Sequence, residues 1–219
     1  MRIRSFIIAY ALVLAILLFA DRRPNPAQQD RYSHVVDLTD AQEGVAQSAA
    51  PSSESRTRIV SPDALIPGTW TAGQIPPERL VAPLVVMDLN VSPVTGSQIS
   101  LDDIAAWETQ HGAVPQGAVV AIRHALADLT PPSTALPITA GAAQFLMEAR
   151  YTTGFAFEAP ADFSTDRTLA RQLALHGNYV VEGTTRLTAL PATGSLIIVA
   201  PAKNRTAGRT PVRVLAMVR

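Results

Sequence analysis

The sequence predicts a single mixed α/β domain preceded by an apolar N-terminal segment. Short apolar runs rich in β-branched residues recur along the chain, each bounded by Gly or Pro, and such runs are typical of buried strands. Between several of these runs, apolar residues recur at three- and four-residue spacings, which indicates helices. A chain of 219 residues is long enough for one such domain with a sizeable core.

Residues 1–20 begin with two arginines and continue as an uninterrupted apolar run, Phe6–Ala20. The run is short for a membrane span, which needs about 20 residues, and it suits a signal peptide. We therefore expect either a cleaved signal or an uncleaved anchor. Both would export the domain, to the periplasm or to the outer side of the inner membrane. A polar linker, 21–31, precedes the domain at 32–219.

The first half of the domain contains two predicted strands. The segment SHVVDLT, at 33–39, is predicted to be the first. Residues 41–58 are rich in Ala, Ser and Gln without periodicity, which indicates a solvated low-complexity loop. A turn-rich loop follows at 59–79. The near-continuous apolar run Leu80–Leu89 is typical of a strand buried on both faces.

Helices and strands then alternate. Ser100 followed by acidic residues predicts a capped helix that ends at Gly112, and Gly117–Arg123 is the next strand. Thr152–Phe157 is another. The helix before it has one apolar face, formed by Ala142, Phe145, Leu146 and Ala149. The helix after it is expected to begin near Ser164 and to stop at Gly177.

The closing segment holds three apolar runs punctuated by Gly and Pro: Tyr179–Val181, Leu196–Ala200 and Val212–Val218. We predict a strand for each. A carboxylate, Glu182, follows the first run, at the end of a strand where a side chain can reach a cleft. This makes Glu182 a candidate site residue.

The composition excludes several classes of function. The 18 basic and 18 acidic residues balance, and no basic patch interleaved with aromatic residues is present, so we expect no nucleic-acid partner. The chain has no Cys, which excludes disulfides, thiolate zinc sites and a Cys nucleophile. It has no G-x-S-x-G motif either. No close histidine pair suggests a metal motif among the four histidines His34, His111, His124 and His176.

The order VVE, turn, TRL, LP, G, IIVAP, PVRVLA in the closing segment resembles the cyclase family, which includes the bacterial kynurenine formamidases. The segments VVDLT, VVMDL and SLDDIAAWETQHG follow the same family order, so the resemblance covers about 32–219. It implies a swivelling β/β/α fold and hydrolysis of amides or esters with bound zinc or manganese. The best-known family activity deformylates N-formylkynurenine in tryptophan catabolism. The resemblance also implies a homo-oligomer.

The resemblance further implies where a metal site would lie. The family motif H-x-G-T-H-x-D-x-P-x-H places its Asp on Asp63, and the family Glu ligand matches Glu182. The opening strand at 33–39 is followed by Asp40, where the family often has His. The positions of the family histidines carry other residues here: Thr57, Ser61 and Ala170 at ligand positions, and Pro67 at the acid–base position.

The surviving candidates have ordinary structural interpretations as well. Asp63 after Pro62 can cap a turn or a helix, and Glu182 can be an exposed charge at a strand end. His176 suits a helix C-terminus, where its charge favours the helix dipole, although it is also a weak catalytic or ligand candidate. Two carboxylates without imidazole would hold Mg²⁺ or Ca²⁺ weakly, so no tightly bound cofactor is expected.

Three functions therefore compete. The first is an exported cyclase-family protein with a degraded metal site, a pseudoenzyme that binds a small-molecule ligand or a protein partner. The second is an active hydrolase with an altered ligand set of Asp63, Glu182 and His176. The third is a scaffold in an envelope complex, attached to the membrane through its N-terminal segment if that segment is not cleaved. The sequence leaves open whether the chain is an enzyme.

Overall fold

A computed structural model describes residues 32–40, 57–89, 98–124, 136–203 and 208–219, and its folded unit comprises His34–Val218. The described strands are β1 (His34–Asp37), β2 (Arg58–Val60), β3 (Val81–Leu89), β4 (Val119–His124), β5 (Gly154–Phe157), β6 (Tyr179–Glu182), β7 (Ser195–Pro201) and β8 (Arg209–Val218). The described helices are α3 (Pro62–Leu65), α4 (Pro77–Leu80), α5 (Leu101–His111), α6 (Ala140–Ala149) and α7 (Arg167–Leu175), with short 3-10 turns at Ala72–Gln74 and Leu187–Ala189.

The strands form a closed barrel with one strand attached to it. Seven strands follow each other in the order β8, β2, β6, β5, β4, β3, β7, and β7 pairs back with β8. β1 pairs with the C-terminal part of β8, beyond the part that pairs with β2. The strands β3, β4, β5 and β6 run parallel, whereas β1, β2, β7 and β8 pair antiparallel. The predicted mixed α/β domain is confirmed.

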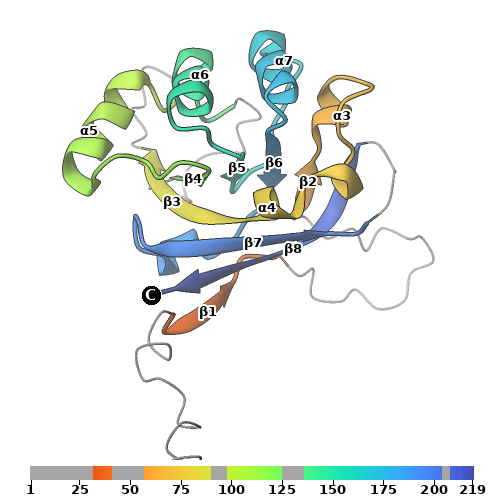
Figure 1. Ribbon diagram of the computed structural model, residues 1–219. Coiled ribbons are helices and arrows are strands. Elements are labelled where there is room, and N and C mark those ends of the chain that lie inside the picture. The colour runs from red at the N-terminus through yellow and green to blue at the C-terminus, as the bar shows by residue number, and fades with distance from the viewer. Residues whose placement is uncertain (1–31, 41–56, 90–97, 125–135, 204–207) are drawn as a thin grey trace, which may run out of the picture. The chain divides into compact units, whose positions relative to one another are not determined.

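The long helices cover the parallel half of the barrel (Figure 1). Each of α5, α6 and α7 connects two neighbouring parallel strands, as parallel pairs require. The predicted capping of α5 is confirmed, because Ser100 accepts a hydrogen bond from the Asp103 amide and Gly112 ends the helix at φ 84°. Helix α7 begins at Arg167, three residues after the predicted start near Ser164. The side chain of Asp166 caps the helix at this point, because it accepts a hydrogen bond from the amide of Leu169.

Two apolar cores lie on the two sides of the barrel wall, and β3 contributes to both. Leu84 and Val86 belong to the core inside the barrel, while Val85 and Met87 belong to the core between the wall and the helices. This alternation follows from the two-residue period of a strand. It explains why the stretch Leu84–Met87 is apolar at every position.

The prediction that this run is buried on both faces is wrong for its first half. Val81 is 50 % exposed, and Pro83 is exposed as well. Both lie before the part of β3 that pairs with β4 and that the helices cover. The first half of β3 pairs instead with β7, which is one of the antiparallel strands.

The loop prediction for 41–58 is wrong at its end. Arg58–Val60 forms β2, which lies between β6 and β8 and closes the barrel. Thr57, just before it, is fully buried. Three residues are too few to show an alternating pattern. Arg58–Val60 is a strand because it pairs with β6 and β8. The remainder of the predicted loop, 41–56, lies outside the described residues.

The predicted N-terminal signal or anchor, 1–20, and the linker, 21–31, also lie outside the described residues. Within the described ranges, no helix has the length and apolar character needed to cross a membrane.

A paired carboxylate connects α5 to the end of α6. Both Glu108 oxygens accept hydrogen bonds from the Arg150 guanidinium, at 2.7 and 2.8 Å, and one also accepts from the Val114 amide at 2.9 Å. The hydrogen bonds from Arg150 lower the pKa of the Glu108 carboxyl below its ordinary value of 4.5. Ionised Glu108 therefore stabilises the folded state above that value, and this contribution is lost as the pH falls through its lowered pKa.

We expect Glu108→Gln to lower the free energy of unfolding by about 1–2 kcal/mol at pH 7, because a bidentate, charge-assisted pair is lost. The difference from wild type should disappear in acid, below the lowered pKa. Urea unfolding of both proteins between pH 7 and pH 3 measures it. A difference that does not change with pH would contradict the role of this ion pair.

Candidate functional site

Glu182 lies at the end of β6, opposite Arg58 at the start of β2. Its side chain is 3 % exposed, so the interpretation as an exposed strand-end charge is wrong. One carboxylate oxygen accepts a hydrogen bond of 3.0 Å from the amide of Ala161, in the segment after β5. A buried carboxylate needs such partners, because burial without them is costly.

Arg209, at the start of β8, approaches the same oxygen. Its Nη2 lies 3.4 Å from Oε1 of Glu182 and donates a 2.6 Å hydrogen bond to the carbonyl of Ala161. Burial raises the pKa of the Glu182 carboxyl, while the Ala161 amide and the positive charges of Arg209 and Arg58 lower it. The guanidinium of Arg209 thus places a positive charge beside the carboxylate of Glu182 and the carbonyl oxygen of Ala161. A metal ion bound to Glu182 would place its charge beside the same carboxylate.

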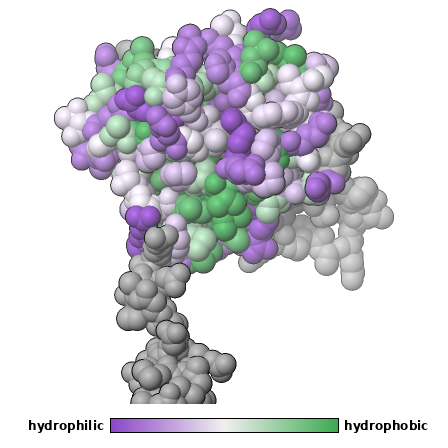
Figure 2. Space-filling model, in the orientation of Figure 1, coloured by the Kyte–Doolittle hydropathy of each residue, from purple (hydrophilic) through white to green (hydrophobic). Residues whose placement is uncertain are grey.

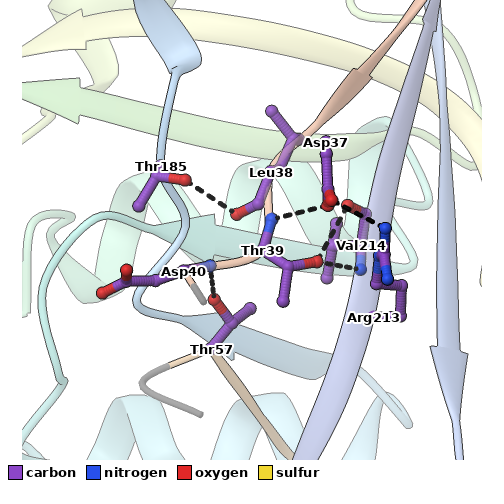
Figure 3. A network of polar contacts seen from close by, with 8 residues as sticks. All are labelled: Asp37, Leu38, Thr39, Asp40, Thr57, Thr185, Arg213 and Val214. Carbon is purple, nitrogen blue, oxygen red and sulfur yellow. Dashed lines mark hydrogen bonds and ion pairs between the residues drawn. The ribbon is translucent and has the colours of Figure 1, made fainter. Parts of the chain in front are cut away.

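Thr57 is held by hydrogen bonds on both sides of its hydroxyl group. The hydroxyl donates to the carbonyl of Gly183 and accepts from the amide of Asp40, both at 2.7 Å. Figure 3 shows the contact between Thr57 and Asp40 beside the segment that follows β1, where the Thr39 hydroxyl bonds to both backbone groups of Val214. The hydroxyl of Thr57 is therefore a structural link between the chain after β1 and the end of β6.

The residues at the other two positions where the family has ligand histidines, Ser61 and Ala170, are both buried. Ser61 is fully buried, and its hydroxyl donates to the carbonyl of Gly208 at 3.4 Å. Ala170 belongs to the apolar core under α7, with 8 % of its surface exposed. Pro67, at the acid–base position, is exposed in the loop after α3.

Asp63 has the contacts of a turn residue. It lies in the first turn of α3, where its carboxylate accepts a 2.8 Å hydrogen bond from the amide of Gly68 and its own amide donates to the carbonyl of Trp70. The capping interpretation therefore describes its observed contacts. Asp63 follows the far end of β2, whereas Arg58, the residue paired with Glu182, begins that strand.

His176 caps the C-terminus of α7, as its helix-terminal interpretation predicts. Its Nδ1 lies 2.9 Å from the carbonyl of Gln172, and its Nε2 lies 4.0 Å from the carboxylate of Glu148. It precedes the start of β6, whereas Glu182 ends that strand. The structure thus places these two candidates at opposite ends of β6.

The described residues contain no group of three or more His, Asp or Glu side chains that could hold a metal ion. The structure instead groups Glu182 with two residues that the sequence did not indicate, Arg58 and Arg209. Arginines at strand ends carry no particular signal in the sequence. Arg209 stands 27 positions after Glu182, so only closure of the barrel brings the two together.

Removing the hydroxyl of Thr57 tests its structural role. We expect Thr57→Val to destabilise the domain by about 2–3 kcal/mol, because it leaves a buried amide and a carbonyl without their partner. Thr57→Ser keeps the hydroxyl and should cost about 1 kcal/mol, the value of one lost methyl group. Thermal unfolding of both variants makes the comparison, and equal losses would contradict the role of the hydroxyl.

A closed barrel of seven strands, with helices over its parallel half, places this chain among single-domain mixed α/β proteins. The model of the Cyclase family matches residues 21–166, more than half of the chain. The chain therefore belongs to the cyclase family.

Solved structures share this fold. Isatin hydrolase A from Labrenzia aggregata, bound to benzyl benzoate, has a TM-score of 0.63 and 24 % identity, over 84 % of this chain and 93 % of that one. Isatin hydrolase A from Ralstonia solanacearum has a TM-score of 0.61 and 23 % identity, over 90 % and 86 %. A structure described as a potential metal-dependent hydrolase with cyclase activity has a TM-score of 0.60 and 22 % identity, over 85 % and 98 %. No curated protein matched the sequence.

Proposed function

We propose that this protein uses the cyclase fold to bind a small-molecule ligand or a protein partner and has lost the metal-dependent hydrolysis of its family. The observation that carries the proposal is the contact between Arg209 and Glu182. The carboxylate of Glu182, which matches a family ligand, has a guanidinium nitrogen of Arg209 3.4 Å away and accepts a hydrogen bond from a backbone amide.

The residues at the family ligand positions do not fit zinc or manganese. Tetrahedral zinc needs about four N, S or carboxylate ligands, and catalytic sites keep at least three from the protein. Thr57 and Ser61 offer hydroxyl groups that are engaged with backbone groups, and Ala170 offers none. A metal held by Glu182 would also have to displace Arg209. The residues at these positions therefore supply no metal-dependent hydrolytic step.

An active hydrolase with Asp63, Glu182 and His176 as ligands is the competing function. It requires these three side chains to converge, yet each has its own separate partners in the structure. Activity against isatin or N-formylkynurenine that falls in both Asp63→Asn and Glu182→Gln would favour it over the binding function.

Metal analysis of the purified full chain decides between the two. We expect less than stoichiometric zinc or manganese after dialysis, and an unchanged melting temperature when EDTA is added, because the apolar cores hold the domain together without a metal. Stoichiometric metal that remains bound after dialysis, or a melting temperature that falls with EDTA and recovers with zinc, would contradict the proposal.

We further propose that the domain acts outside the cytoplasm. The arginines at the start of the chain and the apolar run Phe6–Ala20 support export. An alkaline phosphatase fusion after residue 40 should be active in a bacterial host, because that enzyme needs an oxidising compartment. An inactive fusion would overturn the assignment.

A further inference from the structure

Three charged side chains lie on the same side of the barrel wall where β6 ends. Glu182 and Arg58 are direct partners in the register of β6 with β2. Arg209 is the partner of Val60, two residues further along β2. Partners across paired strands, and residues two apart on one strand, point to the same face. Val60 packs in the core between the wall and the helices, so the three charged side chains point to that outer side as well.

The guanidinium of Arg209 is held at only one of its nitrogens. Its Nη2 donates to the carbonyl of Ala161 at 2.6 Å and lies 3.4 Å from Oε1 of Glu182. In the part of the chain that the structure describes, the N–H groups of Nε and Nη1 have no acceptor. Glu182 and Ala161 therefore fix the position of the guanidinium and leave most of its donors available to a ligand.

Solvent reaches the guanidinium but not the carboxylate behind it. The Arg209 side chain is 42 % exposed, whereas that of Glu182 is 3 % exposed. Arg58 adds a second positive charge beside Glu182. Asp162 is the other acid nearby: hydrogen bonds from Ser164 and, to a smaller degree, the charge of Arg209 lower the pKa of its carboxyl. It is partly exposed, so water screens its charge, and a ligand that approaches Arg209 meets a positive group.

The outer face of β8 changes from charged to apolar along the strand. It begins with Arg209, continues through Arg213, which already donates to Asp37 at 2.8 Å, and ends with Leu215 and Met217. Figure 2 shows the apolar area over β7 and β8, on the side that the helices leave uncovered. The available donors thus lie at the start of β8, beside the carboxyl end of β6. The carboxyl ends of parallel strands are common ligand sites in α/β proteins.

We propose that Arg209 binds the carboxylate group of a small anionic ligand at this site. A guanidinium forms strong, charge-assisted hydrogen bonds with a carboxylate, and one that is held in place loses little freedom when it does so. The inference rests on the proposed function, because a metal ion on Glu182 would displace Arg209. It goes further by assigning the binding residue and the chemical class of the ligand.

Titration of the full chain with benzoate, in a non-ionic detergent and with EDTA present, tests the proposal. We expect the Nε resonance of Arg209 in the ¹⁵N NMR spectrum to shift with a Kd on the order of 1 mM, as for a ligand of this size. Benzamide has the same shape without the charge and should bind at least about tenfold more weakly. No shift at about 20 mM benzoate, equal shifts at several arginines, or equal binding of benzamide overturns the proposal.

Two variants separate the guanidinium of Arg209 from positive charge in general. Arg209→Lys keeps a charge beside Glu182, which preserves the fold, and should weaken benzoate binding about tenfold, because an ammonium group does not reproduce the fixed planar donors. It also identifies the Arg209 resonance by its loss. The matched control, Arg171→Met, removes an exposed guanidinium on α7 and should bind within about twofold of wild type. Ligand-observed NMR measures both, and equal affinities of the two variants would contradict the assignment.

The same titration distinguishes failure of this inference from failure of the proposed function. If benzoate does not bind either with EDTA or with added zinc, the assignment of Arg209 is wrong and the loss of the metal site is unaffected. If benzoate binds only when zinc replaces EDTA, a metal holds the ligand. That result would overturn both the assignment of Arg209 and the proposed function.

Discussion

Replacing Gly154 by alanine is expected to destabilise the domain by about 3 kcal/mol, which lowers the melting temperature by about 6–12 °C for a domain of this size. A Cβ at Gly154 would lie 2.8 Å from both the ring and the carbonyl oxygen of Tyr179. That ring cannot move away easily, because it is fully buried and its hydroxyl donates a 2.8 Å hydrogen bond to the carbonyl of Arg79. β5 and β6 would have to separate to admit the new methyl group.

Gly141→Ala is the matched control. Its added Cβ would meet only the Leu101 side chain, at 3.9 Å, which is an ordinary contact. Gly141 lies in α6, where alanine is the better helix former, so this variant should gain about 0.5–1 kcal/mol. Calorimetry of the two variants gives opposite signs if β5 and β6 pack as described. A stable Gly154→Ala protein would contradict that packing.

Arg209→Met should cost about 2 kcal/mol. Removing one partner of a buried ion pair leaves an uncompensated charge, which costs about 3–5 kcal/mol when both partners are buried. The cost is smaller here because the Arg209 side chain is 42 % exposed and because Arg58 stays near the carboxylate. Arg171→Met, which changes an exposed arginine on α7, should lie within about 0.5 kcal/mol of wild type.

A double-mutant cycle isolates the contact between Arg209 and Glu182. In Glu182→Gln the side chain can still accept from the Ala161 amide, but no charge remains to be neutralised. Arg209→Met should then cost less than 1 kcal/mol, mainly for the lost hydrogen bond to the Ala161 carbonyl. Urea unfolding of the four proteins at pH 7 gives the coupling energy. A coupling near zero would show that Arg209 does not neutralise this carboxylate, and the proposed loss of the metal site would lose its main support.

Local patterns in the sequence predicted much of the fold. Ser100 with its acidic neighbours gave the start of α5, and the runs around Tyr179, Leu196 and Val212 gave β6, β7 and β8. These signals act over one or two turns of helix or along one strand, so neighbouring residues carry them. β2 carried no such signal, because its three residues are strand only through their pairing with β6 and β8.

The candidate site could be predicted only in part. Glu182 was recognised from its place after an apolar run, and His176 from its place at a helix end. The contacts of Glu182 come from Ala161, 21 residues earlier, and Arg209, 27 residues later. These partners of Glu182 depend on which strands are neighbours in the barrel. The order of the strands cannot be predicted from any single segment of the sequence.

The sequence by itself determined the mixed α/β class, most of the strands and both ends of α5, since these depend on contacts between residues that are close along the chain. Only the tertiary structure decided that the sheet closes, that an arginine of β8 reaches the carboxylate of β6, and that the first half of β3 has an uncovered face. A near-continuous apolar run such as Leu80–Leu89 does not show which face the helices will cover. The placement of α5, α6 and α7 over the parallel strands decides it, because the connections between those strands must cross on that side.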